Sequence, residues 1–429
     1  MGFLGNATEQ NADLYLAVLY DALKYNIARR GRFMTLSPYT PGSVPTKLPG
    51  RAEKLHQFRE AAQRIDSEAQ FVPRIHVDHG PRGVGKTSLL REAQRLFSGY
   101  HIKTVLITAD PNENLVRSLL GELKQVVGTG SRLKKAALEA IDSASLTFGA
   151  PGIANLAITV KPNKADTAAS AKQFQRALKA ALNSVTSDGD SGIAILIDEI
   201  QEADPASLRT IAYAWQEMNP LRPFDPEQPR TALFAAGLPG APTKINKAVT
   251  FSERFSFQPI HGLSAAGVRE ALESTAAGVS VIWEQAALDR GVDESSGYPY
   301  KVQLIGDFAW KAAANRLGSA GLNPGDVITL PDIIDALLPV EGEMLTLFKS
   351  RWTGSSTKQQ QMLVAIARLG GEDVKRAVLA EELESTTQAI SVTRQRLLDK
   401  GLLDANKHGH LSFTVPGFTA FVLDQADNE

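Results

Sequence analysis

The stretch that most constrains this chain is residues 80–87, which read Gly80-Pro-Arg-Gly-Val-Gly85-Lys86-Thr87. It matches the pattern G-x-x-x-x-G-K-S/T without a mismatch. Residues 74–79 before it are typical of a strand, and residues 88–97 after it have helical periodicity. Glycines let successive backbone N–H groups surround a polyphosphate at a helix N-terminus, so this context predicts a phosphate-binding loop. The alternative is a chance glycine-rich turn before a helix.

The loop predicts a site for ATP or ADP with Mg²⁺. We expect Lys86 to reach the β- and γ-phosphates and the Thr87 hydroxyl to ligate the metal ion. The nucleotide-binding residues expected in the loop are Gly80, Pro81, Arg82, Gly83, Val84, Gly85, Lys86, Thr87 and Ser88.

A second part of this site is expected at the end of residues 192–199, Gly-Ile-Ala-Ile-Leu-Ile-Asp198-Glu199. An unbroken apolar run rich in isoleucine suits a central parallel strand that is buried on both faces. Ligands bind at the carboxyl ends of such strands. We therefore expect Asp198 to hold Mg²⁺ through water and Glu199 to polarise an attacking water. The alternative is a buried strand whose polar end only begins a helix.

Composition sets broad limits on the class of protein. The chain has 429 residues, with 46 Lys and Arg against 47 Asp and Glu, so no global basic field points to nucleic acid. There is no cysteine, which excludes disulfides and thiol ligands. The first residues lack the pattern of a signal peptide, and no segment has the apolar length of a membrane span. We expect a cytoplasmic protein without a membrane partner.

Alternating strand and helix patterns predict an α/β fold with a parallel sheet covered by helices on both faces. The predicted core covers residues 48–261, after a helix and a Pro-rich connector in residues 1–47. We predict an inserted β-hairpin near residues 146–160, because two alternating segments flank Gly149-Ala-Pro-Gly152. A helical lid is expected over residues 262–340, where the pattern is helical only.

The last predicted domain covers residues 341–429. Helical patterns begin at Thr357, Lys375 and Thr387, and a two-stranded pattern with a polar turn follows over residues 402–415. Three helices followed by a β-wing is the order of a winged helix. The third helix would expose polar groups that can reach DNA bases or phosphates. The DNA-contact residues expected on it are Ser391, Arg394 and Gln395. A winged helix that contacts protein instead remains open.

Most of the chain resembles AAA+ ATPases of the origin-recognition and initiator-like branch. Residues 48–53, Leu-Pro-Gly-Arg51-Ala-Glu, resemble the segment that packs near adenine, and Arg51 would bind nucleotide there. Residues 252–255, Ser-Glu-Arg254-Phe, resemble the box that carries an arginine finger, so Arg254 would be catalytic. Residues 296–300, Ser-Gly-Tyr-Pro299-Tyr, resemble the lid motif that closes on the base. This last motif also occurs in STAND signalling ATPases.

The chain departs from the initiator pattern in two places. Residues 234–240 contain no polar sensor residue at the end of the expected fourth strand, and no lid arginine is evident near Tyr300 or Lys301. The resemblance therefore implies ATP hydrolysis that depends on Lys86 and Glu199 but is slow.

Three functions stay open at this stage. The first is a DNA-associated ATPase that acts as a nucleotide-dependent switch, possible partners being a second copy of the chain or another protein. The second is a STAND-like signalling or regulatory ATPase whose winged helix packs on the core. The third is a regulatory subunit that binds nucleotide and barely hydrolyses it.

Overall fold

The computed structural model describes residues 35–45, 47–149, 164–219, 228–249, 252–405, 407 and 409–427. Contacts divide it into two compact units. One unit holds residues 44–263, 298–300 and 344–429, and the other holds residues 264–297, 301–343 and the described part of residues 1–43. The helix expected before residue 31 lies outside the described residues.

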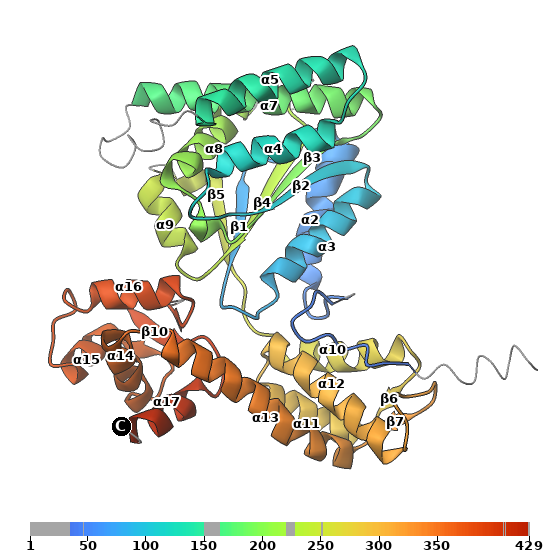
Figure 1. Ribbon diagram of the computed structural model, residues 1–429, viewed down its shortest axis with the longest axis vertical. Helices are drawn as coiled ribbons and strands as arrows, with labels where there is room; N and C mark the ends of the chain where they lie inside the picture. The colour runs from blue at the N-terminus through green and yellow to red at the C-terminus, as the bar shows by residue number, and fades with distance from the viewer. Residues whose placement is uncertain are drawn as a thin grey trace, which may run out of the picture. The chain divides into compact units, whose positions relative to one another are not determined.

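A parallel sheet forms the centre of the first unit, and its strands run in the order β2-β3-β4-β1-β5 (Figure 1). All neighbouring pairs are parallel, which confirms the predicted α/β class. The strands are β1 (Ile75–His79), β2 (Ile102–Thr108), β3 (Gly192–Asp198), β4 (Thr231–Gly237) and β5 (Phe255–Pro259).

Strand β3 is buried on both faces, as its apolar sequence predicts. Its isoleucines at 193, 195 and 197 face one hydrophobic core, and Ala194 and Leu196 face the other. Helices cover both faces of the sheet, so the carboxyl ends of the strands are left for the loops (Figure 1). The first face carries α4 (Leu115–Val127), α5 (Arg132–Gly149), α7 (Lys164–Ser187), α8 (Pro205–Met218) and α9 (Ala241–Ala248), and the second carries α2 (Ala52–Asp66) and α3 (Lys86–Gly99).

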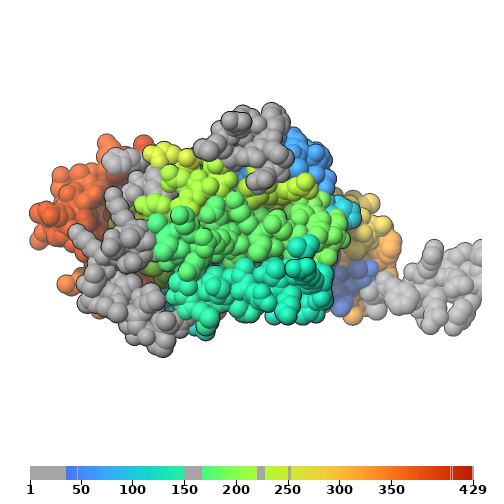
Figure 2. Space-filling view, turned by 90° about the horizontal axis from the view of Figure 1, so that it is seen from above, coloured from blue at the N-terminus to red at the C-terminus, as the bar shows by residue number. Residues whose placement is uncertain are grey.

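The predicted hairpin near residues 146–160 is wrong in its first strand. Residues 146–149 belong to helix α5, which packs along α7 (Figure 2). Ala137, Ile141 and Ala144 are buried at helical spacing, and Phe148 packs on the same core. This long-range packing outweighs a short alternating pattern. The second predicted strand, residues 153–160, lies outside the described residues.

The C-terminal part of the first unit begins with the end of α13 (Leu330–Thr353). Strands β8, β10 and β9 form an antiparallel sheet in that order, and the pairing of β9 with β10 lies in the two-stranded pattern expected over residues 402–415. The order helix, strand, helix, helix, hairpin agrees with the predicted order, with β8 as an addition. The elements are α14 (Thr357–Arg368), β8 (Val374–Lys375), α15 (Arg376–Glu382), α16 (Ser391–Asp399), β9 (Leu403–Asp404), β10 (His410–Phe413) and α17 (Phe418–Asp427).

The second unit is mainly helical, with α10 (Ala265–Ala277), α11 (Gln285–Ser295) and most of α12 (Pro299–Arg316). It is not helical only, because β6 (Ile282–Trp283) pairs with β7 (Val327–Ile328). Tyr39 from the Pro-rich connector is buried in this unit: its hydroxyl donates to the Leu272 carbonyl at 2.5 Å and accepts from the Trp283 indole at 2.8 Å. Among the described helices, none is both long enough and apolar enough to cross a membrane.

Candidate functional site

The phosphate-binding loop joins β1 to α3, as its pattern predicts. Gly85 is the residue before α3 and has φ of 95°, a left-handed conformation that favours glycine. Gly80 N–H donates to the Gly237 carbonyl at 3.1 Å, so the start of the loop is tied to the end of β4. The Lys86 ammonium donates to the carbonyls of Gly80 at 2.9 Å and Pro81 at 2.7 Å. The backbone carbonyls of the loop therefore hold the Lys86 ammonium in place.

Burial lowers the pKa of Lys86 to about 8, while Glu199 and Asp198 oppose this shift and Arg82 adds to it. Polyphosphate brings negative charge, which raises the pKa of the bound lysine. ATP binding near pH 8 should therefore take up about half a proton, and affinity should fall as pH rises above about 8. Calorimetric titrations in buffers of different ionisation enthalpy measure this uptake. A binding enthalpy that is independent of the buffer at about pH 8 would contradict it.

The residues expected to hold Mg²⁺ lie together. The Thr87 hydroxyl donates to Asp198 Oδ2 at 2.6 Å, and Asp198 is 7% exposed. A hydroxyl and a carboxylate are hard oxygen donors, and Mg²⁺ in phosphate sites keeps waters and uses few protein ligands. No group of three or more His, Asp or Glu side chains suited to a metal ion occurs in the described residues. The pair therefore fits a Mg²⁺ ion that the nucleotide itself helps to hold.

Glu199 follows Asp198 and is half-buried at the edge of the same site. Its backbone is left-handed, with φ of 50° and ψ of 42°, which is uncommon outside glycine and typical of functional sites. Its N–H donates to Asp198 Oδ1 at 2.9 Å, and its carboxylate accepts from Gln201 Nε2 at 2.5 Å. The site thus contains a carboxylate held by a buried amide.

Arg51 lies against the loop rather than at a distance from it. Its guanidinium donates to the carbonyls of Val84 at 3.0 Å and His261 at 2.8 Å. Burial lowers the pKa of Arg51, and the Asp78 carboxylate opposes the shift. Asp78 itself pairs with Lys54, which also bonds to Gln258. Arg51 therefore links the phosphate loop to the segment after β5.

Tyr298 covers another part of the loop. Its hydroxyl donates to the Arg82 carbonyl at 2.9 Å, and Arg351 is hydrogen-bonded to the same hydroxyl. Gly83 has φ of 81°, and a Cβ there would lie 2.2 Å from the Tyr298 hydroxyl oxygen. Burial lowers the pKa of Arg351, whose Nη1 is buried without a partner among the described residues. Glycine at position 83 is thus required twice, by its backbone angle and by Tyr298.

The remaining predicted residues are placed as follows. Ser88 is half-buried in the first turn of α3, and Pro299 is the first residue of α12, next to Tyr298. Arg254 is half-buried and ends the short 3-10 helix Ser252–Arg254, just before β5. Their roles remain predictions.

The three residues expected to contact DNA are on α16 and are half-buried. The Ser391 hydroxyl donates to the Thr387 carbonyl at 2.8 Å and accepts from Arg376 at 2.9 Å, and Gln395 donates to Asp399 at 2.9 Å. Arg394 Nε is buried without a partner in the part of the chain that the structure describes. Arg394 therefore has a donor that no other described group uses.

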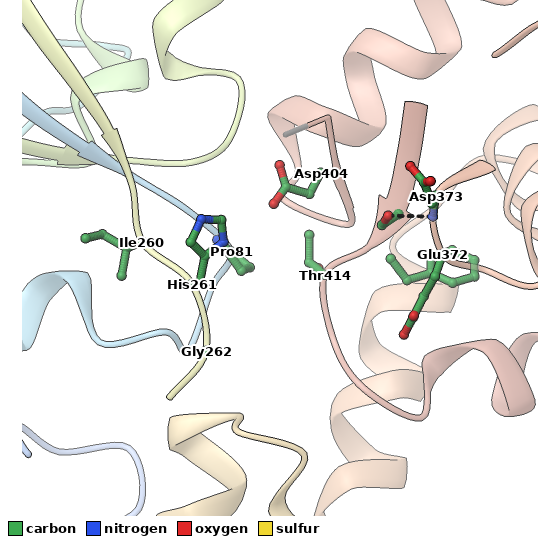
Figure 3. A pocket seen from close by; sticks show the side chains of 10 residues that line it. Pro81, Ile260, His261, Gly262, Glu372, Asp373, Asp404 and Thr414 are labelled. Carbon is green, nitrogen blue, oxygen red and sulfur yellow. Dashed lines mark hydrogen bonds between the residues drawn. The ribbon is translucent and has the colours of Figure 1, made fainter. Parts of the chain in front are cut away.

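A pocket of about 320 Å³ lies beside the phosphate loop (Figure 3). Pro81, His261 and their neighbours line one side, and Asp404, Asp373 and Glu372 contribute carboxylates from the C-terminal part. Carboxylates repel phosphate groups, so this pocket does not suit the nucleotide. The phosphates are instead expected at the backbone N–H groups of the loop and the start of α3.

Sequence reasoning missed two contributors to the site, Gln201 and Lys54, and the contact that Tyr298 of the expected lid motif makes with the loop. Gln201 bonds to Glu199, Tyr298 bonds to the loop, and Lys54 pairs with Asp78 next to Arg51. Gln201 gave a local signal as a polar residue two positions after Glu199, and Tyr298 gave one as part of the motif at residues 296–300. The contacts of Tyr298 and Lys54 join segments that are far apart in the sequence.

Comparisons with known proteins agree with this geometry. An AAA ATPase domain model matches residues 47–223, and a model described as a domain of unknown function (DUF8462) matches residues 345–422. No curated protein sequence matches the chain. Among solved structures, the ORC2 protein of Aeropyrum pernix has a TM-score of 0.55 at 15% identity, covering 91% of this chain and 96% of its own. A Walker-type ATPase of Pyrococcus abyssi has a TM-score of 0.50 at 15% identity, covering 89% and 99%.

These likenesses show the fold along most of the chain, while the domain match agrees with the loop at residues 80–87 and the Asp198-Glu199 pair. The chain therefore contains an AAA ATPase domain over residues 47–223, which carries the phosphate loop and the Asp198-Glu199 pair.

Proposed function

We propose that this protein is a cytoplasmic, nucleotide-dependent switch that binds ATP with Mg²⁺ and hydrolyses it slowly. The observation that carries this proposal is the meeting of Lys86, Thr87, Asp198 and Glu199 at the carboxyl ends of β1 and β3. Bound Mg²⁺ would neutralise charge on the β- and γ-phosphates. Lys86 would hold the phosphates, Thr87 and Asp198 would hold the ion, and Glu199 would orient and deprotonate water.

Slow turnover is supported by the apolar end of β4. Residues 234–240 contribute no polar side chain toward the nucleotide from this strand. Arg254, at the end of its short 3-10 helix, would supply a cation to the nucleotide of a second copy of the chain, or to its own. A switch needs long-lived bound states more than rapid chemistry, and these features suit it.

The C-terminal domain, which we propose is a winged helix, would contact DNA through α16. Support comes from two neighbouring arginines, Arg376 and Arg394, whose Nε atoms are both buried without a partner among the described residues. Burial lowers the pKa of Arg394, and the positive charge of Arg376 lowers it further. Two adjacent guanidinium groups suit a phosphate group, which they can bind through charge-assisted hydrogen bonds.

A second candidate is a STAND-like switch in which the same domain packs on the core. It is favoured by close contacts of the α16 end with the loop after β4. A Cβ at Gly240 would lie 2.8 Å from Asp399 Oδ1, and one at Gly401 would lie 3.0 Å from Leu238 and 3.7 Å from Arg82. In this case α16 would respond to whether the phosphate loop has nucleotide bound, and it would not contact DNA.

Replacing Arg394 with alanine separates the two candidates. In the DNA-associated switch, Arg394→Ala should weaken duplex binding several-fold and reduce the slope of log affinity against log salt by about one. ATP affinity should be unchanged, because Arg394 is outside the phosphate loop. Titrations of a labelled duplex at two salt concentrations, run beside nucleotide release rates, provide the measurement.

Arg396→Ala is the matched control, since it removes the same charge two positions along α16, on a different side of the helix. If the wild-type protein binds no duplex at low salt, the DNA role is lost. Faster nucleotide release in Arg394→Ala would then favour the STAND-like switch.

A further inference from the structure

Gln201 is a buried side chain that connects the segments after β3 and β4, at the carboxyl ends of the strands. It belongs to the short 3-10 helix Ile200–Glu202 that follows Glu199, and it is 5% exposed. Its Oε1 accepts from the Leu238 backbone N–H at 2.9 Å, and its Nε2 donates to Glu199 Oε2 at 2.5 Å. One side chain thus joins the loop after β4 to the proposed base.

The orientation of this amide follows from its partners. The Leu238 N–H can only donate, so the amide oxygen has to face it. The NH₂ group is then directed at Glu199, whose Oε2 accepts from it. The Lys244 ammonium donates to the backbone carbonyl of Gln201, which helps to fix the turn in place. Both ends of the amide are therefore matched, and it cannot flip without leaving two groups unsatisfied.

The end of β4 is shaped around Gln201. A Cβ at Gly237 would lie 2.9 Å from Gln201 Oε1, 2.9 Å from Ile200 Cγ2 and 2.8 Å from Ala241 Cβ. No side chain fits at this position while Gln201 is in place. The polar group beside Glu199 accordingly comes from the turn after β3 and not from β4.

Glu199 depends on this contact for its direction. Its left-handed backbone fixes the Cα–Cβ bond, but a glutamate has further rotatable bonds that remain free unless the carboxylate is held. A general base has to lie within hydrogen-bond reach of the water it activates. A donor anchored at Leu238 restricts the carboxylate to one region of the site.

We propose that Gln201 is a positioning residue for ATP hydrolysis: it orients the Glu199 carboxylate and couples it to the loop after β4. This rests on the role proposed above for Glu199 as the base. Movement of the Leu238 backbone would shift the amide and release or redirect Glu199. The loop after β4 would in this way control hydrolysis without contributing a side chain.

The first test is Gln201→Leu, which keeps the approximate volume and removes the side-chain hydrogen bonds to Leu238, Glu199 and Glu202. We expect kcat for ATP to fall about 10- to 100-fold, because a misplaced catalytic group costs about that much. The dissociation constant for ATP should stay within about threefold, since the phosphate contacts are untouched. The pair of measurements is a single-turnover rate and a nucleotide titration.

The matched control is Gln228→Leu. Gln228 Oε1 accepts from the Phe71 backbone N–H at 3.1 Å, so this change also leaves a backbone donor unsatisfied, but before the start of β4. Its kcat should stay near the wild-type value. Equal losses of kcat in both variants, with equal drops in Tm, would assign Gln201 a purely structural part.

Gln201→Glu gives a readout that a structural role would not move. The new carboxylate could still accept from Leu238 N–H, but it would face the carboxylates of Glu199 and Glu202 with like charge. Like charge raises the pKa of the coupled pair, so the acidic limb of the kcat–pH profile should move up by about one pH unit or more. This variant also tests the proposal if Gln201→Leu fails to fold.

The outcomes separate this inference from the proposed function. Wild-type kcat in Gln201→Leu, or an unmoved acidic limb in Gln201→Glu, overturns the positioning role. If Glu199→Gln hydrolyses ATP normally, the proposed role of Glu199 fails first. If Glu199→Gln is inactive and both Gln201 variants behave as wild type, only the inference about Gln201 fails.

Discussion

Alanine at position 86 is expected to abolish tight ATP binding. The Lys86 ammonium is the cation at the centre of the loop, held over the Gly80 and Pro81 carbonyls, and it is 7% exposed. A hydrogen bond to a charged group contributes about 1.5–3 kcal/mol, so the loss of contacts to two phosphates should weaken binding by roughly 100-fold or more. Titration with a fluorescent ATP analogue or by calorimetry measures the change.

Lys103→Ala is the control for the loss of one positive charge. Lys103 lies near the N-terminal end of β2 and pairs with Asp190 at 3.3 Å. The site, by contrast, is at the carboxyl ends of the strands. ATP affinity in this variant should equal that of the wild type. Tight ATP binding by Lys86→Ala would contradict the proposal that this loop binds the phosphates of ATP.

Glu199→Gln is expected to bind ATP as tightly as the wild type and to hydrolyse it about 10²- to 10⁴-fold more slowly. The amide has nearly the same shape, and its oxygen can still accept from Gln201 Nε2, so the site should keep its structure. It cannot accept a proton from water, so only the chemical step is lost. Single-turnover hydrolysis and the amount of retained ATP are the measurements.

The control is Glu202→Gln, which changes a second carboxylate in the same short 3-10 helix. Glu202 Oε1 is 3.4 Å from Gln201 Nε2, so this variant tests whether any acid near the amide is sufficient. Its hydrolysis rate should stay near the wild-type rate. Equal hydrolysis by Glu199→Gln and the wild type would exclude Glu199 as the base.

The fold was predictable where local pattern and tertiary packing agree. Strand β3 has apolar residues throughout because both faces are covered, and the glycines of residues 80–85 mark the loop by their backbone needs. The Asp198-Glu199 pair follows from its place at the end of that strand. Each of these features depends on a few consecutive residues, so a single sequence contains the information.

The rest depends on contacts between distant segments. Residues 146–149 alternate like a strand, yet Ala144 and Phe148 pack on the core from a helix whose partner is α7. Gln201 meets Leu238, and Tyr298 meets Arg82, only after the chain has folded. No local pattern records these pairings, which explains why the loop was predicted and its supports were not.

The fit between Gly237 and Gln201 also has an evolutionary consequence. Because a Cβ at Gly237 would lie 2.9 Å from Gln201 Oε1, 2.9 Å from Ile200 Cγ2 and 2.8 Å from Ala241 Cβ, position 237 cannot gain a side chain without other changes. A lineage that gains a side chain at the tip of β4 has to make room at residues 200, 201 and 241, and the new side chain must then take over the contact with Glu199. Related sequences should therefore divide into two groups, with the amide on one strand end or the other and few intermediates.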